Sequence, residues 1–292
     1  MFIFFIVKRA TESKDLIHCN CPFIKGLREN TLLNYNTYLH KSSRTWVTFV
    51  HGAGGSSAIW HKQIREFRNH FNILLLDLRG HGDSKPGLRD AFDERYDFDS
   101  ITNDIVEVID HLDIDKSHFV GISLGTVLIR NLAEKHPARV ESMVLGGAIL
   151  KLDFKFRILL GFSVIFKSVV PYIWLYKLFT FAIMPDSNHK ESRLLLVREA
   201  KKLYQKEFIR WFKLSADINP LLRLFRAADI GIPTLYVMGG EDHLFLPSVR
   251  RMVHQHSRSS LLLIEHCGHV VNVEQSALFN NFVIGYVSDL NG

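Results

Sequence analysis

The chain has 292 residues, 47% of them apolar, and a formal net charge of +6. A chain of this length and composition can bury a sizeable core, so it fits one large domain, or one domain that carries an insertion, and excludes a disordered chain. Its three cysteines, Cys19, Cys21 and Cys267, form no disulfide framework and match no zinc-ligand spacing. We therefore expect a reducing, cytoplasmic location and no metal or other cofactor.

The positive charge is concentrated in one segment. Residues 151–230 contain 15 Lys and Arg against 7 Asp and Glu, so the rest of the chain is close to neutral. A neutral body with one cationic segment argues against a protein devoted to nucleic acid. It predicts an acidic partner near that segment, with peripheral membrane contact as a less favoured alternative and a solvated basic face as the simplest explanation.

The predicted elements begin with an apolar end, MFIFFIV, which stops at Lys8 and has no basic residue before it, unlike a signal peptide. We expect an edge strand or a mobile end there, with a truncated membrane-contacting segment as the less favoured alternative. Further along, short apolar runs alternate with segments whose apolar residues are three and four positions apart. The runs lie at residues 45–50, 71–77, 117–123, 141–147, 233–240 and 259–266, and the helical segments at 56–70, 98–113 and 125–136. This alternation predicts an α/β fold in which helices cover both faces of a mostly parallel sheet, with every one of these strands buried on both faces.

The alternation stops between residues 149 and 230. An aromatic and leucine-rich run is followed there by a charged helical stretch from Ser187 to Leu214. Lys167, Pro171 and Lys177 interrupt the apolar run, which is therefore too short to span a membrane. We expect residues 149–230 to form an inserted helical cap, and residues 1–148 and 231–292 to form the core. The aromatic residues of the cap either meet an apolar substrate or pack the interior of the cap.

The stretch GISLG, residues 121–125, lies where a strand must turn at once into a helix. Glycines two positions before and after a serine permit such a turn, which strains the serine backbone and projects the hydroxyl above the sheet. Ser123 is therefore the candidate nucleophile, with an incidental serine in a tight turn as the alternative. The backbone N–H of Leu124 then lies at a helix N-terminus, where it can meet developing negative charge.

A serine nucleophile needs a base and a group that orients the base. His269 follows the last expected strand, and Asp242 follows the strand before it. Because the carboxyl ends of parallel strands share one edge of the sheet, both side chains can meet Ser123 there. We expect His269 to be the base and Asp242 to orient it. Glu241 and Asp217 are the alternative acids.

A second donor of the expected oxyanion hole should come from HGAGG, residues 51–55. This stretch follows the first of the buried strands, and its glycines let the bare backbone approach a substrate oxygen. We assign the N–H of Ala53, to act with that of Leu124. The alternative is a phosphate-binding loop, but the stretch lacks both the Lys-Ser/Thr ending of a P-loop and the spacing of a dinucleotide site.

Five motifs in this order, HGAGG, DLRGHGDS, GISLG, GGEDH and GHVVNVEQ, resemble the α/β-hydrolase superfamily from about Thr45 to the C-terminus. The resemblance implies the α/β-hydrolase fold with an inserted cap and a serine esterase mechanism that needs no cofactor. It gives loop-organising roles, without a part in the chemistry, to His51, Asp77, Arg79, His81 and Asp83. A serine at position 123 is unlike the epoxide hydrolase and haloalkane dehalogenase branches, which have aspartate there.

The expected activity is hydrolysis of a carboxylic ester with an apolar or acyl-chain group, through an acyl-enzyme on Ser123. One alternative is cleavage of a carbon–carbon bond by the same three residues, and another is a non-catalytic receptor with the same fold. A third, which resembles the pimeloyl-carrier-protein methyl ester esterase branch, is an ester delivered by an acidic carrier protein that docks on the basic cap. The residues that could contact such a carrier are Arg193, Arg198, Lys201, Lys202 and Arg210.

Overall fold

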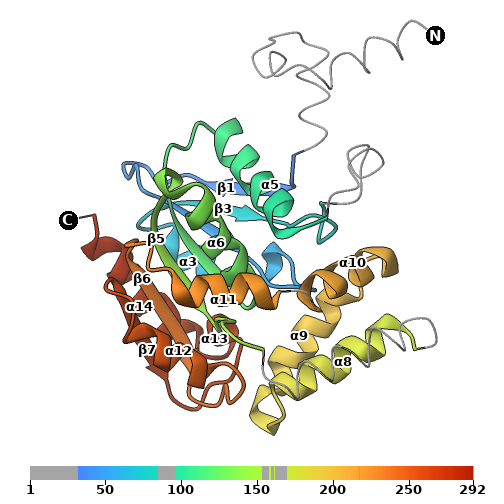
Figure 1. Ribbon diagram of the computed structural model, residues 1–292. Coiled ribbons are helices and arrows are strands. Elements are labelled where there is room, and N and C mark those ends of the chain that lie inside the picture. Colours follow the sequence, from blue (N-terminus) through green and yellow to red (C-terminus); the bar gives the residue numbers. More distant parts are fainter. Residues whose placement is uncertain are drawn as a thin grey trace, which may run out of the picture. The chain divides into compact units, whose positions relative to one another are not determined.

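The computed structural model describes residues 32–84, 96–152, 158, 161, 170–216 and 218–291. Residues 33–86 and 95–292 belong to one compact unit, whose elements are labelled in Figure 1. The N-terminal segment MFIFFIV, Cys19, Cys21, Asp217 and most of the apolar run at 153–169 lie outside the described residues. The predictions made for them stay predictions.

A seven-stranded sheet forms the centre of this unit, in the order β1-β3-β2-β4-β5-β6-β7. β1 pairs with β3 in antiparallel fashion and all other pairs are parallel, which confirms the predicted mostly parallel sheet. The strands are β1 (Tyr35–Tyr38), β2 (Trp46–Val50), β3 (Asn72–Leu76), β4 (Ser117–Ile122), β5 (Val140–Gly146), β6 (Thr234–Gly239) and β7 (Ser259–Ile264). β1 was not predicted, because its sequence YNTY has no apolar run and its two middle residues are exposed.

The burial of β7 differs from the prediction. We expected the run at 259–266 to be buried on both faces, yet only Ile264 of β7 is buried, and the other residues are partly or fully exposed. The reason is the position of β7 at the edge of the sheet, beside β6 alone. Apolar residues in a sequence therefore mark a strand without showing whether it has one neighbour or two.

Helices cover the sheet on both faces. Alternate strand residues Val47 and Phe49 pack in one cluster with Trp60 and Phe279, which belong to helices on one face, and the residues between them point to the other face. The helices of the core are η2 (Ser57–Trp60), α3 (His61–Phe67), α5 (Phe98–His111), α6 (Leu124–Lys135), η3 (Pro137–Arg139), α12 (Leu246–Val253), α13 (Val271–Glu274) and α14 (Ser276–Asp289). α5 begins at a capping box between Asp97 and Ser100, a signal that fixes its start in the sequence.

Between β5 and β6 the described chain is helical. It contains α8 (Tyr172–Ile183), η4 (Ser187–His189), α9 (Lys190–Ala200), α10 (Gln205–Ala216) and α11 (Asn219–Ala227). The charged stretch that we expected to be continuous from 187 to 214 is divided into α9 and α10 by a turn at 201–204. Figure 1 shows α8, α9 and α10 grouped together, with α11 close to α6. Among the helices that the structure describes, none combines the length and apolar character needed to cross a bilayer.

Candidate active site

Ser123 occupies the turn between β4 and α6 with φ 54° and ψ −123°, a left-handed conformation that is strained for a residue with a side chain. The two flanking glycines make this turn possible. A Cβ on Gly125 would lie 2.4 Å from the carbonyl oxygen of Val50, and one on Gly121 would lie 2.5 Å from a methyl group of Ile129. The start of α6 thus packs directly against the end of β2, which lifts the Ser123 hydroxyl above the edge of the sheet.

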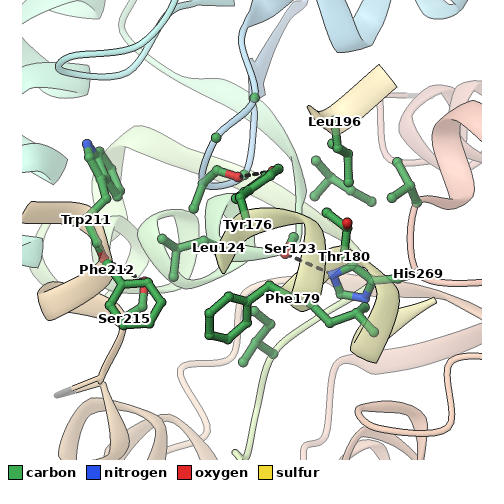
Figure 2. Close-up of a pocket in the computed structure, with 18 of the residues that line it drawn as sticks. Ser123, Leu124, Tyr176, Phe179, Thr180, Leu196, Trp211, Phe212, Ser215 and His269 are labelled. Atoms are coloured by element: carbon green, nitrogen blue, oxygen red, sulfur yellow. Dashed lines mark hydrogen bonds between the residues drawn. The ribbon is translucent and has the colours of Figure 1, made fainter. Parts of the chain in front are cut away.

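The structure brings the three side chains singled out in the sequence into one hydrogen-bonded chain. His269 Nε2 lies 2.8 Å from Ser123 Oγ, and His269 Nδ1 lies 2.8 Å from Asp242 Oδ2. Figure 2 shows the contact between Ser123 and His269. Asp242 and His269 are both buried. With an acid, an imidazole and a hydroxyl in this order, a proton can move from the hydroxyl to Nε2. The Nδ1–H stays on the imidazole and continues to donate to the acid.

The position of His269 depends on a glycine that the sequence analysis did not single out. Gly147 follows β5 with φ 51°, and a Cβ there would lie 2.3 Å from the carbonyl oxygen of His269. The ring of Phe245 packs 5.1 Å from the imidazole, centroid to centroid. The backbone N–H of Phe245 also donates to Asp242 Oδ1 at 3.2 Å, which holds the second carboxylate oxygen. Both the base and the acid are therefore fixed by their surroundings.

The two predicted oxyanion donors lie beside Ser123. A Cβ on Gly52 would lie 3.0 Å from Ser123 Cβ and 3.5 Å from the Leu124 nitrogen, so the two backbone segments are in contact. The carbonyl of Gly52 accepts hydrogen bonds from the Gly55 N–H at 3.1 Å and from His51 Nδ1 at 2.7 Å. The Gly52 carbonyl and the Ala53 N–H belong to the same trans peptide bond and point in opposite directions. Because these bonds fix the carbonyl, they also fix the Ala53 N–H, which points away from Gly55 N and His51 Nδ1. Among the hydrogen bonds of the described residues, neither the Ala53 nor the Leu124 N–H has an acceptor.

Tyr176 of α8 is a site residue that sequence reasoning did not identify as such. Its hydroxyl donates to the carbonyl of Ala53 at 3.0 Å, a contact drawn in Figure 2. Gly54, with φ 75°, leaves room for the ring, because a Cβ there would lie 2.6 Å from the tyrosine. An aromatic helix in the sequence gives no sign of which hydroxyl reaches a loop more than a hundred residues away. Tyr176 holds the loop that carries the candidate donor.

Replacement of Tyr176 by phenylalanine should lower kcat for a small p-nitrophenyl ester about 5- to 10-fold and leave KM nearly unchanged. The lost hydrogen bond contributes about 1 kcal/mol and orients the oxyanion loop without touching the substrate carbonyl. Tyr172→Phe is the matched control, since that hydroxyl donates to the backbone carbonyl of Leu203, away from the loop at residues 51–55. Equal effects of the two substitutions on kcat would contradict the role given to Tyr176.

The motif DLRGHGDS organises the loops beneath the site. Asp77 Oδ1 accepts the Ser57 N–H at 2.7 Å, and its Oδ2 accepts the Asp83 N–H at 2.9 Å. His81 Nε2 accepts the Gly54 N–H at 2.9 Å, so His81 directly supports the loop that carries the candidate donor Ala53. His51 and Arg79, to which the resemblance also gave loop-organising roles, fix neighbouring segments of the chain. His51 Nε2 accepts the Leu78 N–H, and Arg79 forms a buried ion pair with Asp104 at 2.8 Å.

Burial and the nearby His51 lower the pKa of His81 from 6.5 to about 3. His81 is therefore neutral in the folded protein, whereas in the unfolded chain it gains a proton below about pH 6.5. The stability that this difference provides is fully present above pH 6.5 and is lost as the pH falls towards 3. The free energy of unfolding of the wild type and of His81→Gln can be measured with urea between pH 7 and pH 4.5. As the pH falls, the wild-type value should decrease more steeply than that of His81→Gln, by about 1.4 kcal/mol per pH unit. Parallel pH profiles would contradict this assignment.

An apolar cavity of about 140 Å³ opens at Ser123 and His269. Its wall combines the loop at residues 52–55 with side chains of the helices between β5 and β6, including Phe179, Leu196 and Trp211, which are labelled in Figure 2. Among the described residues that line it, His269 is the single titratable group besides Tyr176, and none is Lys, Arg, Asp or Glu. A cavity of this size and character in another protein holds a benzene-sized apolar group.

The basic residues proposed to contact an acidic carrier mostly have partners within the chain. Arg193 donates to the backbone carbonyls of Met184 and Asp186, Arg198 and Lys202 pair with Glu199, and Arg210 pairs with Glu207. These pairs give four of the five side chains a part in holding the helices between β5 and β6. Docking of a carrier protein stays a prediction.

Comparisons with known proteins relate the chain to hydrolases. A family model described as alpha/beta hydrolase fold matches residues 45–165. 3-Oxoadipate enol-lactonase 2 of Acinetobacter baylyi is 25% identical over 90% of this chain and 96% of its own length. The putative carbamate hydrolase RutD of Agrobacterium fabrum is 28% identical over 81% of this chain and 90% of its own.

Solved structures give the same result for the fold. MenH from S. aureus superposes with a TM-score of 0.76 at 17% identity, over 88% of this chain and 99% of its own. The enol-lactonase from Burkholderia xenovorans LB400 has a TM-score of 0.74 at 17% identity, over 88% of this chain and 96% of its own. The sequence relatives support a hydrolase, and the sheet order, the family model and the structural neighbours together confirm the α/β-hydrolase fold that the sequence resemblance implies.

Proposed function

We propose that the protein is a serine hydrolase that cleaves carboxylic esters carrying an uncharged, apolar group, through an acyl-enzyme on Ser123. The observation that carries the proposal is the chain of hydrogen bonds from Ser123 through His269 to Asp242 at the wall of an apolar cavity. Relatives named enol-lactonase and carbamate hydrolase support hydrolysis at an acyl carbon.

In the proposed reaction, Ser123 Oγ attacks the ester carbonyl while His269 Nε2 takes its proton. The N–H groups of Ala53 and Leu124 donate to the carbonyl oxygen as it becomes an oxyanion. The C–O bond to the alcohol then breaks, and His269 Nε2–H protonates the departing oxygen. In the second half, His269 Nε2 removes a proton from water, and the resulting hydroxide attacks the acyl carbon. The bond between that carbon and Ser123 Oγ then breaks, and His269 Nε2–H returns a proton to Oγ. Asp242 keeps Nδ1–H oriented throughout.

The polarity of the cavity supports an uncharged substrate. A carboxylate buried against this lining would lose its hydration with no Lys or Arg among the described lining residues to replace it. The same feature favours an ester over the carbon–carbon bond alternative, because the branch of this fold that cleaves such bonds usually carries additional arginine or polar residues in the pocket. The free thiol of Cys267 is buried, and burial raises its pKa, so it offers no competing nucleophile.

A pair of esters of matched length tests the proposal. p-Nitrophenyl butyrate should be hydrolysed with a kcat/KM at least about 100-fold higher than p-nitrophenyl hemisuccinate, which places a carboxylate in the apolar cavity. A vinylogous dienone should not be cleaved. A faster reaction with the hemisuccinate would contradict the apolar substrate class, and cleavage of the dienone without ester hydrolysis would favour the carbon–carbon bond alternative.

A further inference from the structure

A second cluster of titratable side chains lies behind the proposed catalytic residues. His189, in η4, is completely buried. Its Nδ1 lies 2.8 Å from Glu274 Oε2, and the same oxygen accepts the Gly268 N–H at 2.7 Å. The imidazole lies directly on Gly268, where a Cβ would come within 2.7 Å of the ring. Because a carboxylate accepts at Nδ1, the neutral ring carries its proton there and leaves the lone pair on Nε2.

The Nε2 atom faces two further carboxylates. It lies 3.2 Å from Glu241 Oε2 and 3.9 Å from Asp186 Oδ2, yet this buried atom has no hydrogen-bond partner among the described residues. Two carboxylates beside Nε2 call for a positive charge between them, and either a proton on Nε2 or a metal ion bound to its lone pair would supply it. Ligand atoms about 2.0–2.1 Å from a tetrahedral zinc ion are themselves about 3.3 Å apart. The separation of Nε2 and Glu241 Oε2 matches that value.

We propose that Asp186, His189 and Glu241 form a binding site for a divalent transition metal of the zinc type. The three ligand atoms lie within 4.8 Å of one another. Glu274 holds the imidazole from its other nitrogen, the arrangement typical of metal-bound histidine. One imidazole with two carboxylates favours zinc and similar ions over Mg²⁺ and Ca²⁺, which prefer oxygen ligands alone. The sequence did not predict this site, because its ligands come from the segment 186–189 and from the loop after β6 and match no linear motif.

The position of the site gives the ion a structural role. Glu241 precedes Asp242, and Gly268, bound by Glu274, precedes His269. Asp186 and His189 belong to the segment between α8 and α9. A bound ion therefore connects that helical segment to the two loops that carry the proposed acid and base. It touches no atom of Ser123, so its binding is separable from the proposed ester hydrolysis.

Calorimetric titration with ZnCl2 tests the site on the full-length, untagged chain. His18, Cys19 and Cys21 could take up zinc independently, so the chain carries Cys19→Ser and Cys21→Ser. We expect one zinc ion per chain, a rise in Tm of about 5 °C or more when zinc exceeds its Kd 100-fold, and no response to MgCl2. Absence of both binding heat and a Tm shift with zinc would overturn the proposal.

Single substitutions in the same background test the ligands. Asp186→Asn, at an exposed position that leaves folding undisturbed, and His189→Gln should abolish the zinc-dependent Tm shift. Glu274→Gln should weaken binding about 10- to 100-fold. His266→Gln is the matched control, because this exposed histidine lies 3.8 Å from the other oxygen of Glu241 and is not among the three proposed ligands. It should bind zinc like the parent chain, and an equal loss in His266→Gln and Asp186→Asn would overturn the assignment.

Discussion

Replacement of Ser123 by alanine should lower kcat for p-nitrophenyl butyrate about 10⁴- to 10⁶-fold while KM changes little. The hydroxyl is the group that would form the covalent bond, and without it the remaining donors and the base act on a carbonyl that only water can attack. Steady-state kinetics with both proteins measure the ratio directly. The substitution removes one oxygen at a turn that the glycines already shape, so Tm should be close to that of the wild type.

Ser288→Ala is the matched control for this experiment, since Ser288 lies exposed near the end of α14, outside the site. Its kinetics should equal those of the wild type. Retention of more than about a tenth of the wild-type kcat in Ser123→Ala would show that the hydroxyl is not the nucleophile. Residues 121–125 would then be a strained turn that contains an incidental serine.

Replacement of Asp242 by asparagine should lower kcat about 10⁴-fold. The Phe245 N–H donates to Asp242 Oδ1, so an asparagine keeps its carbonyl oxygen on that side and turns its NH2 towards His269. Nδ1 must then accept a hydrogen bond, which moves the imidazole proton to Nε2 and leaves no acceptor for the Ser123 hydroxyl. Stopped-assay kinetics at pH 7 to 8 measure the loss.

Asp289→Asn, at an exposed carboxylate near the C-terminus, is the control for charge removal and should behave like the wild type. An Asp242→Asn protein within tenfold of the wild-type kcat would contradict the assignment of the acid. Glu241, the neighbouring residue and the alternative acid, would then be the next candidate to orient His269.

Local sequence rules predicted most of the sheet and the juxtaposition of Ser123, Asp242 and His269. The reason is that in a parallel sheet each strand delivers its carboxyl end to the same edge, so residues just after three strand ends converge wherever they stand in the chain. The strand-to-helix turn was readable because its two glycines and its serine lie within five consecutive residues, 121–125, even though Gly125 packs against the distant end of β2. Strand β1 was missed because it is held by pairing with β3 and not by its own apolar content.

Contacts between the helical segment and the loops could not be predicted. Tyr176 reaches Ala53, and His189 reaches Glu241 and Glu274, across separations that depend on how α8, η4 and α9 pack. The sequence shows an aromatic helix and a lone histidine, each of which more often belongs to a packed interior than to a site. Gly54 and Gly268 are the nearest sequence signals, since Gly54 leaves space for the ring of Tyr176 and Gly268 for that of His189, but a glycine does not identify the residue that packs on it.

Covalent labelling tests the central claim most directly. The full-length protein treated with a fluorophosphonate should gain one adduct by intact mass, and peptide mass spectrometry should place it on Ser123 in the peptide that contains GISLG. Ser123→Ala should gain none, and His269→Gln should react far more slowly. A folded wild-type protein that stays unlabelled, or one labelled at another residue, would contradict a nucleophilic Ser123.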